Sequence, residues 1–348
     1  MKIAVFLPNW VGDAVMATPA LRALRTHYAD AEILAVHRPY VGDVLSGLDL
    51  VDRSLLHDPR GDRQLNGWRF VRTLRGERPD LAVLFPNSLR TAWLAWIAGI
   101  PRRVGFRRDG RSWLLTDPVT PRSRTVPNPV LDEYLRLVSH LGIASDSRTM
   151  ELNTLDTDED VLKDFWSRQT SLPHSQYVCL NPGGAFGAAK DWPSESFGLL
   201  AHRIAAELHH NVVVLCGPSE RATAREIVSI ADHPGVVGLY DMPLSLGLTK
   251  AAIRHADLLV TTDSGPRHFA PPFQTPVITL FGPTHIAWSE TYYDQAVHLQ
   301  HPVDCGPCQQ RVCPLEHHKC MRELRVDRVF SEVENQLNPQ TTHSNRVA

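Results

Sequence analysis

Residues 181–192 (NPGGAFGAAKDW) combine the residue types that could bind a sugar diphosphate. They follow an apolar run, residues 177–180, so the Pro-Gly-Gly turn is expected at the carboxyl end of a strand, where α/β proteins bind ligands. Glycines such as Gly184 let backbone N–H groups approach a phosphate closely, and Lys190 adds one mobile positive charge. An ordinary strand-to-helix loop with a surface lysine would have the same pattern, so the motif alone leaves both interpretations open.

A second candidate phosphate site lies in residues 261–284 (TTDSGPRHFAPPFQTPVITLFGPT). An apolar strand is expected to end at Asp263-Ser264-Gly265, and a short helix to begin there with its positive end toward the ligand. Asp263 suits the hydroxyl groups of a sugar, and His268 could reach a phosphate or sugar oxygen. Asp-Ser-Gly is also a common capping sequence, and a lone histidine is more often structural.

Two further carboxylates occupy positions where chemistry is possible. Asp13, in PNWVGDAVMATPAL, follows the first predicted strand and could accept a proton from a substrate hydroxyl, or could cap a helix. Glu220, in CGPSERATA, follows the strand predicted over residues 212–216. An acidic residue at the end of the second strand of a nucleotide-binding half commonly contacts ribose hydroxyls, and a solvated helix-start residue is the alternative.

Residues 101–113 (PRRVGFRRDGRSW) concentrate positive charge. Guanidinium groups at this density suit phosphate or carboxylate groups on an acceptor, and solvated surface arginines are the alternative. The arginines are Arg102, Arg103, Arg107, Arg108 and Arg111.

Four cysteines near the carboxyl end, Cys305, Cys308, Cys313 and Cys320, are as crowded as metal ligands. Their spacing lacks the second tight Cys-x2-Cys pair of standard zinc patterns. A structural zinc at this cluster is therefore the disfavoured alternative to reduced thiols or a pairing loop.

Strand-like and helix-like segments alternate along the whole chain, which is typical of α/β folds with parallel, doubly wound sheets. The predicted strands cover residues 1–7, 32–37, 49–57, 81–85, 177–180, 212–216, 236–239, 258–262 and 277–281, and the predicted helices cover 14–28, 89–97, 131–141, 196–208 and 219–231. The acidic stretch 156–176 predicts a helix and a linker. We therefore expect two domains, residues 1–170 and 171–325, then a helix and tail over 326–348, with ligands in the cleft between the domains.

The composition excludes several classes of protein. The chain has 348 residues, of which 43% are hydrophobic, which is ample for two cores. The 36 basic and 38 acidic residues nearly cancel, which argues against bulk binding of nucleic acid. Residues 1–7 lack the length and cleavage site of a signal peptide, and no run approaches a membrane span. We expect a cytoplasmic protein with reduced thiols.

The predicted helix over residues 89–97 is rich in tryptophan. Trp93, Trp96 and Ile97, with Arg102 and Arg103, could dock on an anionic glycolipid at the cytoplasmic face of the inner membrane. A helix buried in the core is the alternative, and it is the interpretation we favour.

Several motifs together resemble the ADP-heptose:lipopolysaccharide heptosyltransferases, and within that family the heptosyltransferase II branch. They are NWVGDAVMATPAL, RVGFRRDGRSWLLT, NPGGAFGAAKDWP, DSG with a histidine three residues after the glycine, TLFGPT and CGPCQQRVCPLEHHKCM, and they extend from the amino terminus to Cys320. The resemblance implies a GT-B fold, with two facing Rossmann-like domains and a central cleft, acceptor on the first domain and nucleotide sugar on the second. It also implies inverting transfer of L-glycero-D-manno-heptose from ADP-heptose to the first heptose of the lipopolysaccharide inner core, without a metal.

The same resemblance assigns roles to residues. Asp13 would be the general base, and Lys190 would neutralise the departing diphosphate. The donor would be held by Gly184, Glu220 at the ribose, Met242 beside the adenine, and Asp263, Ser264, Gly265 and His268 at the diphosphate and heptose, while Arg107, Arg108 and Arg111 would bind the acceptor. Three prolines, Pro266, Pro271 and Pro272, depart from the family pattern, so we expect a short or bent helix after Asp263.

Two other functions remain possible from the sequence. A GT-B transferase of the same lineage could use another nucleotide sugar or acceptor, because the loops that select the sugar are the least diagnostic. A two-domain binding protein of periplasmic type also closes around a small ligand, but it would need an export signal and would have no use for Lys190 opposite Asp13.

Overall fold

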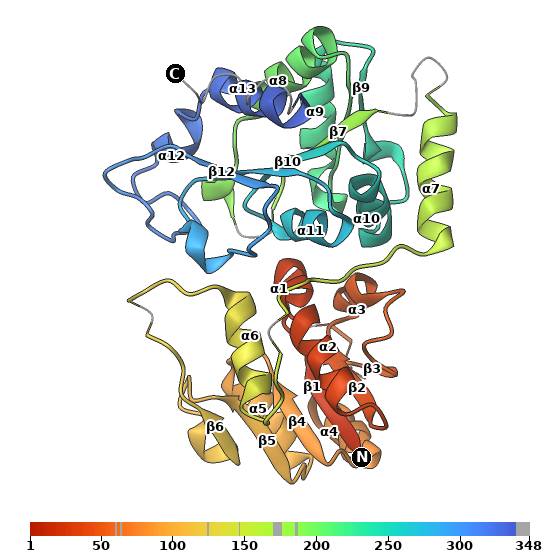
Figure 1. Ribbon diagram of the computed structural model, residues 1–348, viewed down its shortest axis with the longest axis vertical. Coiled ribbons are helices and arrows are strands. Elements are labelled where there is room, and N and C mark those ends of the chain that lie inside the picture. Colours follow the sequence, from red (N-terminus) through yellow and green to blue (C-terminus); the bar gives the residue numbers. More distant parts are fainter. Residues whose placement is uncertain are drawn as a thin grey trace. The chain divides into compact units, whose positions relative to one another are not determined.

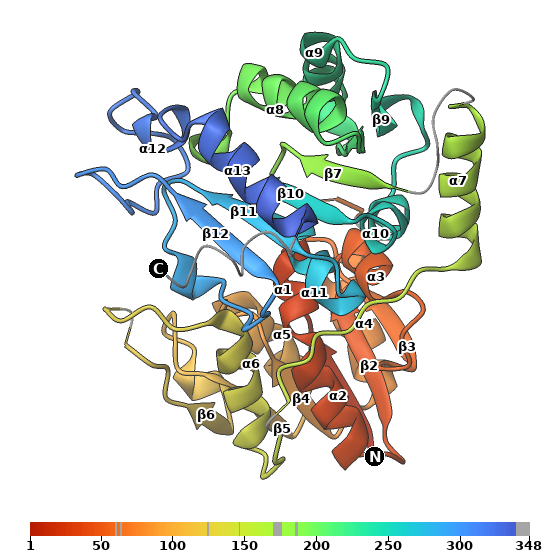
Figure 2. The same cartoon turned by 45° about the horizontal axis from the view of Figure 1, so that its top comes forward.

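The computed structural model describes residues 1–59, 61–62, 65–123, 125–145, 147–169, 176–184 and 187–338. The chain divides into two compact units: residues 1–153 with 287–292, and residues 154–286 with the part of the chain from 293 onward. Each unit is built on one sheet with helices on both faces (Figures 1 and 2). The boundary predicted at residues 170 and 171 lies outside the described residues.

The helix α7 (Asp156–Ser167), predicted to end the first domain, belongs to the second unit. Its Glu159 carboxylate lies 2.8 Å from the imidazole of His255. Its Trp166 ring packs on Tyr177, with the ring centroids 5.0 Å apart. Packing against the second core, which the linker-like composition does not reveal, therefore decides where this helix belongs.

The first unit contains a sheet of six parallel strands in the order β3-β2-β1-β4-β5-β6. The inner strands are buried apolar runs, as parallel strands covered on both faces must be. The strands are β1 (Lys2–Phe6), β2 (Glu32–His37), β3 (Arg53–Leu56), β4 (Leu81–Leu84), β5 (Arg102–Phe106) and β6 (Asp117–Val119). The sequence did not predict β5 and β6, because β5 begins with two arginines and β6 is three residues long with a central proline.

Helices cover both faces of this sheet. α4 (Gly67–Glu77) and α5 (Leu89–Ile97) pack their apolar residues against one face, where Phe70, Leu74 and Leu94 are buried. α1 (Val11–Met16), α2 (Thr18–His27) and α6 (Val130–Ser139) lie together on the other face (Figure 1). α3 (Pro39–Leu45) packs beside α1, and a 3-10 turn, η2 (Ser112–Leu114), follows β5.

The second unit repeats this topology, with six parallel strands in the order β12-β11-β10-β7-β8-β9. The strands are β7 (Tyr177–Asn181), β8 (Asn211–Val214), β9 (Val236–Gly238), β10 (Leu258–Thr262), β11 (Val277–Phe281) and β12 (Ala296–Gln300). The first strand in sequence lies at the centre of each sheet, and the order reverses beside it. This is the switch point at which doubly wound proteins bind ligands.

Three helices, α8 (Ser194–Glu207), α9 (Arg221–Ala231) and α13 (Val326–Leu337), pack on one face of the second sheet around Phe197, Ile204 and Val333. α10 (Leu246–Arg254) and α11 (Ala270–Phe273) lie on the other face, where the Tyr177 hydroxyl donates to the Ala252 carbonyl at 2.8 Å (Figure 2). Short 3-10 turns connect these elements: η3 (Ala188–Lys190), η4 (Pro218–Glu220), η5 (Leu239–Asp241) and η6 (Gly265–Phe269), with one more helix, α12 (Lys319–Arg322). A further 3-10 turn, η7 (Ile286–Trp288), begins at the end of this segment and continues into residues 287–292, which belong to the first unit.

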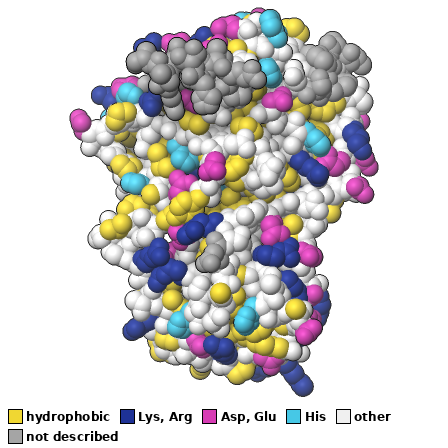
Figure 3. Space-filling model, in the orientation of Figure 1, with side chains coloured by type: hydrophobic (Ala, Val, Ile, Leu, Met, Phe, Trp, Pro, Cys, Tyr) yellow, Lys and Arg dark blue, Asp and Glu magenta, His cyan; other side chains and the backbone are white. Residues whose placement is uncertain are grey.

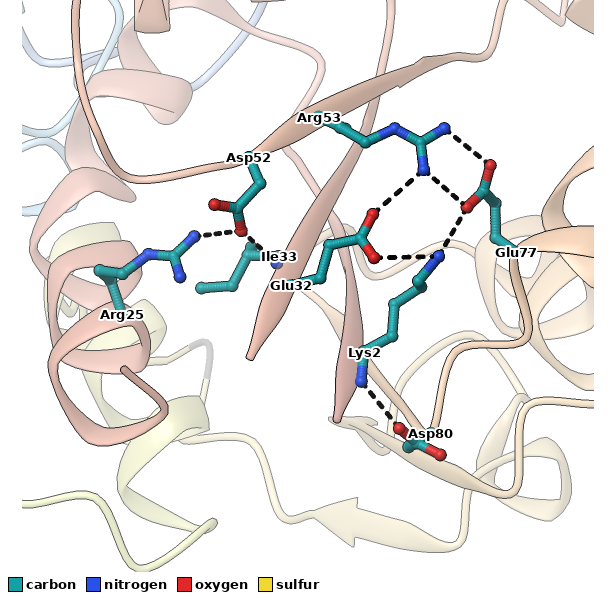
Figure 4. A network of polar contacts seen from close by, with 8 residues as sticks. All are labelled: Lys2, Arg25, Glu32, Ile33, Asp52, Arg53, Glu77 and Asp80. Carbon is teal, nitrogen blue, oxygen red and sulfur yellow. Dashed lines mark hydrogen bonds and ion pairs between the residues drawn. The ribbon is translucent and has the colours of Figure 1, made fainter. Parts of the chain in front are cut away.

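The amino edge of the first sheet carries a network of ion pairs (Figure 4). Lys2 Nζ lies 2.8 Å from Glu77 and 3.1 Å from Glu32, and Arg53 contacts the same two carboxylates. Exposed pairs of this kind contribute little to stability singly, and a shared network contributes more. The network lies at the edge opposite the carboxyl ends of the strands.

Charges of both signs are interspersed with apolar side chains on the face of the molecule seen in Figure 3. This agrees with the near-neutral composition. None of the helices within the described residues is long and apolar enough to cross a membrane.

Replacing Phe197 by alanine is expected to destabilise the second unit by about 3–5 kcal/mol, because a fully buried ring would leave a cavity. The measurement is the free energy of unfolding from denaturant titration followed by circular dichroism. Leu199→Ala is the matched control, since Leu199 lies on the same helix with 53% of its surface exposed. A Phe197→Ala protein as stable as this control would contradict the packing described.

Candidate functional site

The carboxyl edge of the second sheet is organised around Asn181, the last residue of β7. Its side-chain amide donates to the Gly183 carbonyl at 3.2 Å, to Thr261 Oγ1 at 3.0 Å and to Ser264 Oγ at 2.9 Å. These bonds fix the turn after β7 against the end of β10. A Cβ added at Gly184 would lie 3.0 Å from the Ser264 side chain, so a larger residue there would require Ser264 to shift.

Lys190 and Asp263 form a buried ion pair at this edge. Lys190 Nζ lies 2.5 Å from Asp263 Oδ2 and donates to the Asp263 carbonyl oxygen at 2.9 Å. Arg267, which the sequence analysis missed, contacts the other carboxylate oxygen at 3.2 Å, and Thr284 donates to Oδ2 at 2.7 Å. The two predicted phosphate loops thus meet in one cluster of two cations and one carboxylate.

The electrostatics of the cluster favour an anionic ligand. The positive charges of Lys190 and Arg267 hold the pKa of Asp263 far below its usual range, against the opposing effect of burial. Lys190 and Arg267 place two positive charges beside one carboxylate in a site from which solvent is largely excluded. Fixed positive charges at a buried site of this kind are suited to a phosphate group.

His268 lies beside this cluster with 4% of its surface exposed. Burial, and then the nearby Arg267, lowers its pKa well below the usual value, so the imidazole is neutral at physiological pH. Within the described part of the chain, its Nδ1 atom has no hydrogen-bond partner. A buried nitrogen of this kind is suited to a hydrogen bond with a bound ligand.

The helix after Asp263 is short, as the prolines predicted. The chain forms a 3-10 turn, η6, and then the four-residue helix α11, which contains Pro271 and Pro272. Ser264 and Gly265 lie at the start of η6. The predicted short or bent helix is confirmed.

Glu220 and Met242 flank the same edge of the second unit. Glu220 accepts a hydrogen bond from the Gly217 N–H at 2.7 Å and lies against Gly183, where a Cβ would meet its carboxylate. The side chain therefore caps its own turn and also borders the glycine loop. Met242 is 4% exposed, and its carbonyl accepts from Arg221 at 3.1 Å. Their assigned ribose and adenine contacts remain predictions.

The cysteine-rich segment supports the turn that carries Lys190. The Arg311 carbonyl accepts a hydrogen bond from Ala189 N–H at 3.1 Å. Gly187 has φ +143°, and a Cβ there would lie 2.5 Å from the same carbonyl oxygen. The loop from 305 to 320 is therefore a structural part of the site, which its sequence did not indicate.

Four free thiols and His317 line a cavity of about 30 Å³ in this segment. Hydrogen bonds from the backbone around His318 lower the pKa of Cys313, whereas burial raises the pKa of Cys320. Cys305 Sγ lies 3.8 Å from His317 Nε2. Among the described residues, no three metal-binding side chains are arranged to hold a metal ion.

Asp13, the predicted base, lies in the first turn of α1 at the carboxyl edge of the first sheet. The N-cap position is occupied by Trp10, so the alternative that Asp13 caps the helix is wrong. Its charge is close enough to Tyr134 to raise the pKa of that phenol, after the larger effect of burial. Asp13 is half-buried.

The arginines of residues 101–113 separate into different roles. Arg102 pairs with Asp117 at 2.9 Å, and Arg103 donates to the Leu114 carbonyl at 2.7 Å, so both stabilise the sheet edge. Arg107 is exposed and Arg108 is half-buried just after β5, where an acceptor could reach them. These two keep the predicted acceptor role.

Arg111 is fully buried, which does not fit direct contact with an acceptor. Its guanidinium donates to the carbonyls of Phe106 at 3.0 Å and Pro86 at 2.5 Å, and burial lowers its pKa to about 10. A Cβ at Gly105 would lie 3.1 Å from this guanidinium. Arg111 therefore links the loops after β4 and β5 and supports the segment that carries Arg107 and Arg108.

Solved structures share this architecture over nearly the whole chain. A family 9 glycosyltransferase from Veillonella parvula superposes with a TM-score of 0.82 at 21% identity, covering 97% of each chain. The Escherichia coli ADP-heptose lipopolysaccharide heptosyltransferase II superposes with a TM-score of 0.79 at 23% identity, covering 98% of this chain and 100% of the other. Two Rossmann-like units with this topology define the GT-B class of glycosyltransferases, which confirms the predicted fold class.

Sequence comparison then gives the family. Residues 67–319 match the profile of glycosyltransferase family 9 (heptosyltransferase), and the chain belongs to this family. Lipooligosaccharide heptosyltransferase 2 of Campylobacter jejuni is 25% identical over 341 residues, covering 97% of this chain and 98% of the relative. Lipopolysaccharide heptosyltransferase 2 of Escherichia coli K12 is 29% identical over 292 residues, covering 82% and 83%. The alternative of a non-catalytic binding protein is set aside.

Asp263→Asn is expected to destabilise the second unit by about 3–5 kcal/mol, because two buried cations lose their counter-charge. The lowered pKa of Asp263 also predicts a pH dependence. Its stabilising contribution is complete above the unfolded-state pKa near 4 and is lost as pH falls toward the folded-state value. The free energy of unfolding, measured by urea titration, should fall less between about pH 6 and 2 in the variant than in the wild type. An equal fall in the two proteins would contradict the pairing of Asp263 with Lys190 and Arg267.

Arg111→Lys is expected to lower the free energy of unfolding by about 2–4 kcal/mol, since an ammonium group cannot supply the forked donors to the two loops. Arg107→Lys, an exposed change in the same segment, is the control and should stay within about 0.5 kcal/mol of the wild type. A tolerated lysine at position 111 would mean that the carbonyl contacts are not important for stability.

Proposed function

We propose that the protein transfers L-glycero-D-manno-heptose from ADP-heptose to the inner-core heptose of lipopolysaccharide, with inversion at the anomeric carbon. The observation that carries this proposal is the cluster of Lys190, Arg267 and Asp263 at the switch point of the second sheet in a family 9 chain. Relatives named heptosyltransferase 2 match over nearly the whole chain, which favours this donor and acceptor.

The second unit would bind the donor. Backbone N–H groups of the half-buried turn at Gly183 and Gly184 would contact the diphosphate, and Lys190 would supply the positive charge beside them. Ser264, Gly265 and the neutral His268 border the same cluster, and Asp263 would hold Lys190 and Arg267 beside the diphosphate and the heptose. Glu220 and Met242 would contact the ribose and adenine.

The first unit would supply the base and bind the acceptor. Asp13 takes the proton of the acceptor hydroxyl as that oxygen forms a bond to the anomeric carbon. The bond from the anomeric carbon to the β-phosphate oxygen breaks in the same in-line displacement, which inverts the configuration. ADP leaves with one additional negative charge, and Lys190 and Arg267 stabilise it, the task that a divalent cation performs in other transferases. Arg107 and Arg108 would bind anionic groups of the acceptor.

The proposed acceptor is a glycolipid, so the proposal also places the protein in the cytoplasm, in peripheral association with the inner membrane. A related GT-B transferase with another nucleotide sugar or acceptor is the second candidate. Competition of ADP-heptose against ADP-glucose and GDP-mannose for binding distinguishes the two, because only ADP-heptose should bind tightly under the first proposal.

Asp13→Asn is expected to reduce kcat by about 10²–10⁴-fold while leaving ADP affinity unchanged, because only the proton acceptor is removed. The assay is ADP release from ADP-heptose with a heptosylated acceptor. Asp30→Asn, an exposed change in the same unit, is the control and should retain activity. Retained activity in the Asp13 variant would reject the base assignment.

Lys190→Ala is expected to reduce kcat by about 10²–10³-fold, through loss of transition-state charge stabilisation, and also to weaken ADP binding. Lys163→Ala on the exposed face of α7 removes one positive charge of the same unit without touching the cluster. ADP release by the wild type should persist in excess EDTA. A Lys190 variant with normal kcat, or a wild type inactivated by EDTA, would contradict the proposed role of the lysine.

A further inference from the structure

Four tryptophans are exposed on one region of the first unit. Trp68 on α4 is 63% exposed, Trp93 and Trp96 on α5 are 37% and 45% exposed, and Trp113 on η2 is 69% exposed. The core interpretation favoured for Trp93 and Trp96 is therefore wrong. Inward positions of α5 are occupied by Ala92, Leu94 and Ala95, which pack on the sheet.

The tryptophans form one continuous face. The Trp68 and Trp93 rings meet edge to face with centroids 6.3 Å apart, and the Trp96 and Trp113 rings do so at 6.2 Å. Arg75 near the end of α4 donates to the Ile97 carbonyl at the end of α5, so the two helices lie side by side. We call the outward surface of α4, α5 and η2 the tryptophan face.

The charge of this face is almost entirely positive. The two helices contain four arginines, Arg69, Arg72, Arg75 and Arg90, and one acidic residue, Glu77. Glu77 is already paired with Lys2 and Arg53 at the sheet edge. Within the described residues Arg69, Arg72 and Arg90 have no ion pair. Burial lowers the pKa of the nearby His57 to about 4, and the charge of Arg90 contributes to this shift.

Indole rings and arginines together match the chemistry of a bilayer surface. Indole is amphipathic and concentrates at the boundary between lipid headgroups and acyl chains, and basic side chains near it are attracted to anionic headgroups. Four exposed indoles in a single cluster exceed what scattered surface apolar residues explain. Arg102 and Arg103, the partners expected from the sequence, are instead occupied by Asp117 and backbone carbonyls.

We propose that the tryptophan face docks the protein on an anionic phospholipid bilayer, with Trp68, Trp93, Trp96 and Trp113 in the interface and Arg69, Arg72 and Arg90 on the headgroups. This inference rests on the proposed function in one respect: docking would bring the enzyme to an acceptor that is held in the membrane. The lipid binding itself involves no heptose and no ADP, so it is measured independently.

The first experiment is co-sedimentation of the full chain with vesicles of phosphatidylcholine, with and without phosphatidylglycerol. The wild type should bind the phosphatidylglycerol vesicles, and high salt should weaken the binding. Arg72→Glu should lower partitioning by at least about fivefold. Lys163→Glu on α7, which makes the same change of charge at an exposed helical site, should not. Absence of vesicle binding, or equal losses in the two variants, would overturn the proposal.

The second experiment tests the indoles. Trp68→Ser with Trp96→Ser should lower vesicle binding, whereas Leu199→Ser, an exposed apolar residue of the second unit, should not. Circular dichroism verifies that each variant is folded. If the double tryptophan variant is unfolded, the vesicle binding of the Arg72→Glu protein decides the outcome. Binding by a folded double variant equal to that of the wild type would overturn the role of the indoles.

Activity separates this inference from the proposed reaction. The Arg72→Glu protein should keep its kcat/KM on a deacylated, water-soluble acceptor and lose it on the same acceptor embedded in phosphatidylglycerol vesicles. Equal loss on both acceptors would overturn the docking role. An inactive wild type that still binds vesicles would reject the proposed function and leave the docking surface intact.

Discussion

The ion pair between Lys190 and Asp263 is the constraint on which the carboxyl edge of the second sheet depends. It joins the turn after β7 to the turn after β10, two segments 73 residues apart in the chain. The Asn181 side chain joins the same two turns through hydrogen bonds to Thr261 and Ser264. The Arg311 carbonyl accepts a hydrogen bond from Ala189, next to Lys190. Contacts with both turns therefore hold Lys190 in place. A positive charge held in place in this way is preorganised, which is the condition for strong electrostatic stabilisation of a transition state.

The shared topology of the two units places different chemical groups at equivalent positions. Each sheet has its first strand in sequence at the centre. After that strand the first unit carries a carboxylate, Asp13, and the second carries a glycine turn followed by a cation, Lys190. Under the proposed function, one architecture used twice would provide a proton acceptor in one unit and an anion site in the other.

The sequence predicted those parts of the structure that depend on local pattern. Apolar runs followed by glycine or Asp-Ser-Gly located β7, β10 and the loops that follow them, and three prolines predicted the short helix after Asp263. Arg267 was missed because its role arises only when η6 brings it back against Asp263. Arg111 looked like its exposed neighbours, and only three-dimensional packing shows that it binds backbone carbonyls. The outward tryptophans of α5 could have been anticipated, since the alanines at positions 92 and 95 mark the side that lies close to the sheet.

The pair between Lys190 and Asp263 has a thermodynamic consequence for the proposed reaction. A diphosphate would compete with a carboxylate already in contact with the ammonium group, so its net affinity would be the difference between two charge pairings. The same competition would act on the product, because Asp263 would pair with the lysine again as ADP departs. Under the proposed function, the pair would therefore combine strong stabilisation at the moment of bond breaking with weak inhibition by the product.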